Sequence, residues 1–290
     1  MPTLKEFNVK LTRLRSTRKL TKTMKLVSVN KLRRAQEAEK RVGLIADRLS
    51  GVLGKLGASV AAGEHVLLTP RKTVKSVLVL VITSDRGLCG GFNNNLIKAV
   101  SPWVRGQEAN HRSVLMSFAG RRGYSFFKSR ATVDRYYEDV MGKPDYASAH
   151  RIGRSLLSAF TGKRVDEVYL AYNVTQGTLS QKPLIERILP MDVEHLAGAG
   201  GGKPAAGWLL EPSTEELLNN LLPRIVSLKV YTALLNSSAG EHSARMKAME
   251  QASSNADSLI RQITLDRNRA RQAAITTELT EIVAGAESLK

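Results

Sequence analysis

The C-terminal part of the chain predicts a helix that is too long to fit inside a globular domain. No proline follows Pro223, and Ser213 with Glu216 forms a capping box at the start of the segment. At 1.5 Å per residue, some 70 helical residues span roughly 100 Å. We therefore expect much of this helix to stand clear of the remainder of the chain. Gly240 interrupts the helical pattern without necessarily ending the helix.

The N-terminal part predicts a second long helix. Thr3 and Glu6 form another capping box, and neither glycine nor proline occurs from Thr3 to Val42. Small and apolar residues recur in both segments at steps of mostly three and four, a spacing typical of a coiled-coil seam. We expect the two helices to pair antiparallel. The predicted seam contains Leu20, Met24, Val27, Ala35, Ala38, Val42, Ile45, Leu49 and Val52 in the first helix, and Met249, Ala252, Ala256, Leu259, Ile263, Ile275, Leu279, Ile282 and Ala286 in the second.

The middle of the chain alternates strand and helix patterns. Residues 76–83 are continuously apolar and β-branched, as expected for a strand that is buried on both faces. Further strands are predicted at 114–118, 168–172 and 184–189, with helices at 93–104, 124–130 and 146–160. The predicted fold is α/β: an antiparallel coiled coil of long N- and C-terminal helices plus a central Rossmann-like α/β domain. The expected boundaries are 1–57 for the first helix, 70–195 for the central domain, 196–211 for a flexible loop and 212–290 for the last helix.

The sequence offers no constellation for catalysis or for a cofactor. Residues 84–91 (SDRGLCGG) lie between a strand and a helix, where a Rossmann fold would bind phosphate. Their glycine spacing does not fit that fingerprint, and a tight turn is the simpler interpretation. The five histidines are scattered, without metal-ligand spacing, and Cys89 is expected to be a small buried residue. We therefore predict no enzyme activity, no metal and no cofactor.

Positive charge is concentrated at the start of the chain. The first 50 residues hold 14 lysines and arginines against four acidic residues, an excess of ten in a chain whose net charge is +18. Such an excess favours an acidic partner, which could be nucleic acid, anionic lipid or protein. Nucleic-acid binders usually add aromatic side chains, and membrane-surface helices add bulky apolar ones. Here Phe7 is the only aromatic residue before Phe92, so an acidic protein surface fits better, with a nucleic-acid-binding protein as the alternative.

The sequence contains a single cysteine and no apolar run of about 20 residues, so we expect neither a disulfide framework nor a transmembrane span. The N-terminus is basic but lacks the apolar core of a secretory signal. The helical pattern starts within the first few residues, which argues against a removable transit peptide and favours a bacterial origin.

Four motifs in order resemble the gamma subunits of F-type ATP synthases. The motifs are residues 21–28 (TKTMKLVS) continuing to 31–35 (KLRRA), 84–93 (SDRGLCGGFN), 241–246 (EHSARM), and 270–276 (ARQAAIT) with 278–286. The resemblance extends from about residue 3 to about residue 287. It implies a non-catalytic rotor in the central stalk, whose rotation couples transmembrane proton flow to ATP synthesis or hydrolysis on the beta subunits and regulates ATPase activity.

The resemblance also implies partners and roles for single residues. The expected partners are the alpha/beta hexamer, the epsilon subunit and the membrane ring of c subunits, at the cytoplasmic face of the bacterial inner membrane. Nucleic acid is not an expected partner, and membrane association is expected only through the complex. Contacts of the shaft with beta subunits are implied for Met24, Arg33, Arg34, Arg245 and Gln272, a bearing at the top of the hexamer for Ile275, Leu279, Ile282 and Val283, and contacts of the foot for Trp208 and Glu211.

Overall fold

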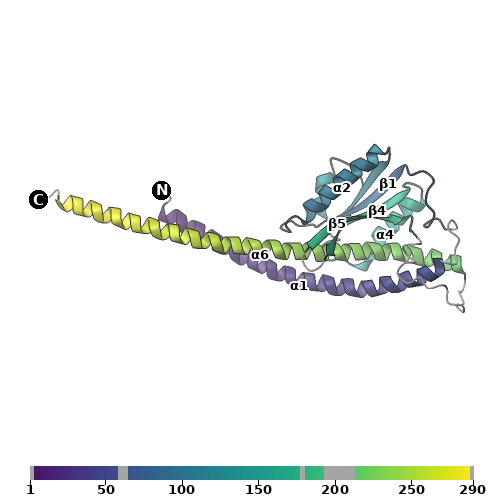
Figure 1. The fold of residues 1–290 in the computed structure, drawn as a ribbon, viewed down its shortest axis with the longest axis horizontal. Helices are drawn as coiled ribbons and strands as arrows, with labels where there is room; N and C mark the ends of the chain where they lie inside the picture. Colours follow the sequence, from purple (N-terminus) through teal and green to yellow (C-terminus); the bar gives the residue numbers. More distant parts are fainter. Residues whose placement is uncertain (1–2, 58–64, 177–179, 193–212, 288–290) are drawn as a thin grey trace. The chain divides into compact units, whose positions relative to one another are not determined.

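The computed structural model describes residues 3–57, 65–176, 180–192 and 213–287. The chain forms two compact units. One unit, called here the terminal unit, contains the two ends of the chain, up to Ser28 and from Arg245 onward. The other, called here the central unit, spans Val29–Ala244. Helices α1 (Leu4–Gly57) and α6 (Thr214–Glu287), the two long helices in Figure 1, contribute residues to both units.

Both long helices begin at the predicted caps. Thr3 N donates to a Glu6 carboxylate oxygen at 3.1 Å, and Glu6 N donates to Thr3 Oγ1 at 3.3 Å, which completes the reciprocal capping box. At the start of α6, Glu216 N donates to Ser213 Oγ at 3.2 Å. Gly240 does not end α6. A Cβ added there would meet Phe92 Cε2 at 3.1 Å and Gln181 Cγ at 3.3 Å, so a glycine allows close packing at this point.

Within the terminal unit the two helices run antiparallel, as predicted. Arg18 forms an ion pair with Asp257, and Lys25, seven residues later, forms one with Glu250, seven residues earlier. The buried positions of α6 in this unit include Met249, Ala256 and Ile263, which were predicted seam residues. The seam prediction was wrong for Leu259, Ile275, Leu279 and Ile282, because their side chains are 45% to 66% exposed.

The predicted seam of α1 was wrong at three positions. Leu20, Val27 and Ile45 are 60%, 51% and 52% exposed. The buried residues instead follow a strict seven-residue spacing at Thr21, Ser28, Ala35 and Val42. One residue along a helix turns the side chain by about 100°, so an offset of one exchanges the buried face for an exposed one.

Two of these buried positions carry hydroxyl groups that bond within their own helix. Thr21 Oγ1 donates to the carbonyl of Arg18 at 3.0 Å, and Ser28 Oγ donates to that of Met24 at 2.8 Å. A hydroxyl that is satisfied in this way can be buried, and its small side chain lets the partner helix approach closely. Small hydroxyl residues therefore take seam positions that the sequence pattern assigned to leucine and valine.

The central unit is built around a five-stranded sheet with the order β3-β2-β1-β4-β5. The strands are β1 (Ser76–Ile82), β2 (Ser113–Ala119), β3 (Thr132–Tyr137), β4 (Glu167–Gln176) and β5 (Ser180–Leu189). The first four pair in parallel, and β5 is antiparallel to β4. This order, with the first strand in the middle, confirms the predicted Rossmann-like domain.

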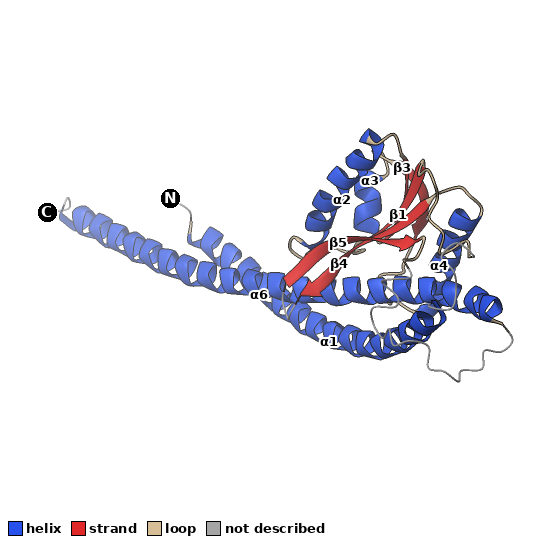
Figure 2. Ribbon diagram, turned by 45° about the vertical axis from the view of Figure 1, so that its right-hand side comes forward, coloured by secondary structure: helices blue, strands red, loops and turns tan. Residues whose placement is uncertain are grey.

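Helices cover both faces of this sheet (Figure 2). Val77, Val79 and Val81 of β1 pack toward α2 (Phe92–Ala109) and α3 (Arg121–Phe127). The alternate residues Leu78, Leu80 and Ile82 pack toward α4 (Tyr146–Thr161) and the first half of α6. Side chains of a strand point alternately to opposite faces, so burial on both explains why β1 is apolar throughout.

The sequence prediction missed one strand and misplaced some helix ends. Helix α2 continues to Ala109 rather than 104, and α3 begins at Arg121 and ends at Phe127 rather than spanning 124–130. Strand β3 was not predicted. It lies at the edge of the sheet, and its charged residues Asp134 and Arg135 interrupt the apolar pattern that identifies a strand.

Candidate functional site: the outer surface of the long helices

The basic residues of α1 lie on its surface. Of the 14 lysines and arginines in the first 50 residues, all except the half-buried Lys25 are exposed. Few carboxylates oppose them: besides the pairs of Arg18 and Lys25, Arg33 bonds to Glu37 at 3.0 Å within the same helix. The outer surface of α1 is therefore strongly positive and attracts an acidic surface.

Apolar side chains interrupt this basic surface. Leu20, Leu26 and Val27 are all more than half exposed. Apolar residues amid charged ones, on a helix whose own seam is already occupied, indicate contact with another molecule. The sequence analysis did not propose these residues as contacts, because it assigned Leu20 and Val27 to the seam. The seven-residue spacing of the neighbouring Thr21 and Ser28 was the signal in the sequence that could have placed these two in the seam and Leu20 and Val27 on the surface.

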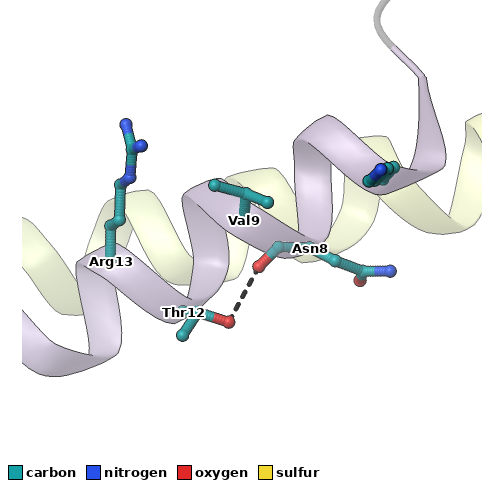
Figure 3. A pocket seen from close by; sticks show the side chains of 5 residues that line it. Asn8, Val9, Thr12 and Arg13 are labelled. Atoms are coloured by element: carbon teal, nitrogen blue, oxygen red, sulfur yellow. Dashed lines mark hydrogen bonds between the residues drawn. The ribbon is translucent and has the colours of Figure 1, made fainter.

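The predicted contact residues of α1 differ in exposure. Arg33 and Arg34 are exposed, and Arg33 is held by its bond to Glu37. Met24 is half-buried. Near the start of the helix, the side chains of Lys5, Asn8, Val9, Thr12 and Arg13 line a groove. Figure 3 shows Thr12 Oγ1 donating to the carbonyl of Asn8, at 2.9 Å.

The predicted contact residues of α6 also differ from one another. Gln272 is exposed. Arg245 is only 8% exposed, so most of its side chain is already covered within the chain. A partner can therefore reach Gln272 directly, whereas Arg245 offers little free surface.

The last turns of α6 carry an exposed apolar face. Ile275, Leu279, Ile282 and Val283 are all about half exposed or more, and their spacing of four, three and one places them on one side of the helix. The described residues of the terminal unit leave this face exposed. Exposed aliphatic side chains in this arrangement suit an apolar collar around the helix.

The turn after β1 is held together by its own side chains. Asn93 Oδ1 accepts from Ser84 N at 2.9 Å, and Asn93 Nδ2 donates to Ser84 Oγ at 2.7 Å and to Cys89 Sγ at 3.2 Å. Cys89 is buried, as predicted. The polar groups of Ser84 and Asn93 therefore bind one another and hold the turn in place.

The described residues hold no group of three or more His, Cys, Asp or Glu side chains that could bind a metal. Among them, none of the helices is both long and apolar enough to cross a membrane. Trp208 and Glu211, which were predicted to contact the foot partners, lie outside the described residues, as does the whole predicted loop at 196–211.

The family model for ATP synthase matches residues 3–289. The ATP synthase gamma chains of Trichlorobacter lovleyi and Geobacter metallireducens are 39% and 40% identical to this chain over 290 residues, and the alignment covers all of both chains in each case. The gamma chain of Anaeromyxobacter sp. strain Fw109-5 is 41% identical over 294 residues, again with full coverage of both chains.

This chain belongs to the ATP synthase gamma chain family.

Solved structures agree with this membership. A chain from the central stalk and c-ring of Tetrahymena thermophila mitochondrial ATP synthase is 26% identical, with a TM-score of 0.59, covering 81% of this gamma chain and 99% of that chain. A chain from the Euglena gracilis mitochondrial ATP synthase shares the fold, with a TM-score of 0.67 and 19% identity, covering 99% of this gamma chain and 94% of that one.

Proposed function

We propose that this gamma chain is the rotating central stalk of a bacterial ATP synthase and carries out no chemistry itself. The observation that carries the proposal is the outer surface of the long helices. Small side chains such as Thr21, Ser28 and Ala256 fill much of their seam. Leu20, Leu26 and Val27 are exposed among basic residues, and the apolar face at the end of α6 is exposed as well. A two-helix unit that buries so little against itself is suited to being enclosed by another protein.

The proposed mechanism is a mechanical population shift. The alpha/beta hexamer encloses the shaft, and each beta subunit meets a different side of it as the shaft turns. Each side contacts one conformation of the beta subunit better than the others, so rotation moves the nucleotide sites through their states and couples proton flow to ATP synthesis or hydrolysis. The same contacts let the shaft regulate ATPase activity.

Within this proposal, single residues have defined roles. Met24, Arg33, Arg34 and Gln272 contact the beta subunits, and Arg245 supports that region from its covered position. The apolar face of Ile275, Leu279, Ile282 and Val283 turns in a bearing at the top of the hexamer. Trp208 and Glu211 contact the c-ring and the epsilon subunit. The chain is held at the cytoplasmic face of the inner membrane through the complex alone.

The test is recovery of the tagged chain from its own host in mild detergent, followed by mass spectrometry and an ATPase assay. We expect alpha, beta and epsilon subunits in fixed proportion, with ATPase activity in the eluate, and none of these from a host that carries the untagged chain. Recovery with nucleic acid and without those subunits would show that the basic helix serves nucleic acid, and the rotor proposal would then be wrong.

A further inference from the structure

A pocket in the central unit, lined by residues outside the two long helices, brings four arginines together. It has a volume of about 380 Å³. Arg135 comes from β3, Arg151 and Arg154 from α4, and Arg164 from the turn before β4. Ala147, His150, Ser155 and Ser158 complete the lining. The volume is within the range of small-molecule sites, which is about 300–1,000 Å³.

The scaffold under this pocket is rigid. On α4 the residues Ala147, Arg151, Arg154 and Ser158 follow at steps of four, three and four, and so share one side of the helix. The opposite side of α4 is packed into the core. Asp145 caps the helix by accepting from Ser148 N at 2.8 Å. A fixed helix therefore presents its two arginines toward the edge strand that carries Arg135.

Charge compensation in this group is incomplete. Asp134 forms an ion pair with Arg164 and also accepts from Ser117 Oγ at 3.2 Å. The side chains of Arg135, Arg151 and Arg154 form no hydrogen bond or ion pair with the residues that the structure describes, and Arg151 has only the nearby charge of Asp145, which acts without an ion pair. Three positive charges thus line one small concavity. Like charges held close together repel one another, so a bound anion stabilises the arrangement.

We propose that this pocket binds a phosphate group. A guanidinium presents N–H donors in a planar fork that matches phosphate oxygens, and one phosphate bears up to two charges and several acceptor oxygens. It can therefore bridge two or three arginines at once, with Ser155 and Ser158 as further donors at the wall. A single carboxylate has one charge and two oxygens, which leaves most of the excess charge unpaired. The source of the phosphate is either a free phosphate compound or the headgroup of a phospholipid.

The first arm of the test is calorimetric titration of the full-length chain with inorganic pyrophosphate at constant ionic strength. The pocket variant is Arg151→Gln with Arg154→Gln, and the control is Lys98→Gln with Arg105→Gln, which removes the same charge from exposed positions on α2. We expect pyrophosphate to bind the unchanged chain and the control, and to bind the pocket variant at least about tenfold more weakly. Arg135→Gln, on the other wall, is a second variant that leaves α4 intact and is expected to weaken binding as well.

The second arm distinguishes the two sources of phosphate by sedimentation with phosphatidylcholine vesicles that contain or lack cardiolipin. Pyrophosphate binding that depends on the pocket identifies a free phosphate compound. Cardiolipin-dependent sedimentation that falls in the pocket variant and not in the control, without pyrophosphate binding, identifies a headgroup. Equal behaviour of the pocket and control variants in both arms would refute the proposal. So would a pocket variant that changes only the recovery of a partner protein, because the pocket would then be a protein interface.

Discussion

Arg18 Nη1 lies 2.8 Å from Asp257 Oδ1, and this ion pair joins the two helices of the terminal unit. Lys25 and Glu250 form a second pair one heptad away on each helix, so the two pairs share a single antiparallel register. Between them the seam holds small residues such as Thr21 and Ala256. Small residues fill the seam without selecting one alignment, so the charged pairs at its margin help to define the register.

The first prediction concerns the pair of Lys25 and Glu250. Exchanging either charge alone, by Lys25→Glu or Glu250→Lys, places like charges together and lowers stability, whereas the double exchange restores most of the loss. Both side chains are partly exposed, so each single effect should stay below about 1 kcal/mol and shrink with added salt. Thermal unfolding at low and high salt measures this. The control is the exchange of Arg33 and Glu37, a pair within one helix. A double variant no more stable than the two singles would contradict the register.

The architecture of this gamma chain could be predicted to a large extent from its sequence. The apolar segment of β1, the capping residues of the two long helices and the lack of proline after Pro223 are local signals. The strand, the two caps and the long C-terminal helix that these signals predicted were confirmed. The strand β3 gave no such signal. Its burial is partial, and Asp134 is satisfied by Arg164 from a distant part of the chain, a pairing that no local pattern contains.

The contact surface was harder to predict than the fold. A seven-residue spacing in the sequence indicates a helix seam, but a set of apolar residues shifted by one position fits this spacing nearly as well. Only the pairing of the two helices shows that Thr21, and not Leu20, is the buried residue. The hydroxyl bond of Thr21 to Arg18 makes its burial favourable, and this depends on backbone geometry rather than on hydrophobicity. The arginine pocket likewise depends on tertiary structure, because its residues come from separate elements that meet only in the fold.

The second prediction concerns Gly120, at the end of β2. Its φ is 105°, and a Cβ at this position would lie 2.0 Å from the carbonyl oxygen of Thr83. Gly120→Ala must therefore move the backbone of the strand next to it, and we expect a loss of about 2–4 kcal/mol in the free energy of unfolding. Gly106→Ala, in α2, is the control. Beyond its chain neighbours and the backbone of its own helix, no atom lies within 4 Å of a Cβ at Gly106, so the change should be neutral or stabilising by up to about 1 kcal/mol. Denaturant unfolding should give a lower free energy of unfolding for Gly120→Ala than for Gly106→Ala. Similar free energies for the two variants would contradict the prediction.

The third prediction concerns Asp166, which joins the starts of β1 and β4. Burial alone would raise the pKa of this carboxyl, but hydrogen bonds from Lys75 N at 2.8 Å and Ser76 N at 3.0 Å outweigh burial and hold the pKa below its usual range. A lowered pKa in the folded state means that the charged form adds stability above pH 4 or so, and that this stability is lost as the pH falls further.

Asp166→Asn should therefore be less stable than the unchanged chain at neutral pH, and the difference should shrink as the pH falls below about 4. Urea unfolding over a series of pH values measures this, with Glu138→Gln, at an exposed position, as the control. A difference that stays constant with pH would show that the hydrogen-bond geometry, and not the charge of Asp166, is what the variant removes.

The fourth prediction tests the proposed role of Gln272 as a contact of the shaft with beta subunits. Because Gln272 is exposed, Gln272→Ala should leave the thermal unfolding of the chain unchanged. Arg245→Ala cannot separate an effect on folding from an effect on contact in this way, since Arg245 is largely covered.

The loss of one interfacial hydrogen bond is worth about 1 kcal/mol, or about a factor of five in the preference of the shaft for one beta conformation. ATP-driven proton pumping per ATP hydrolysed, measured in vesicles that contain the complex, should therefore fall. Gln262→Ala, at another exposed glutamine of α6, should couple normally. If both variants pump like the unchanged complex, Gln272 is not a coupling contact.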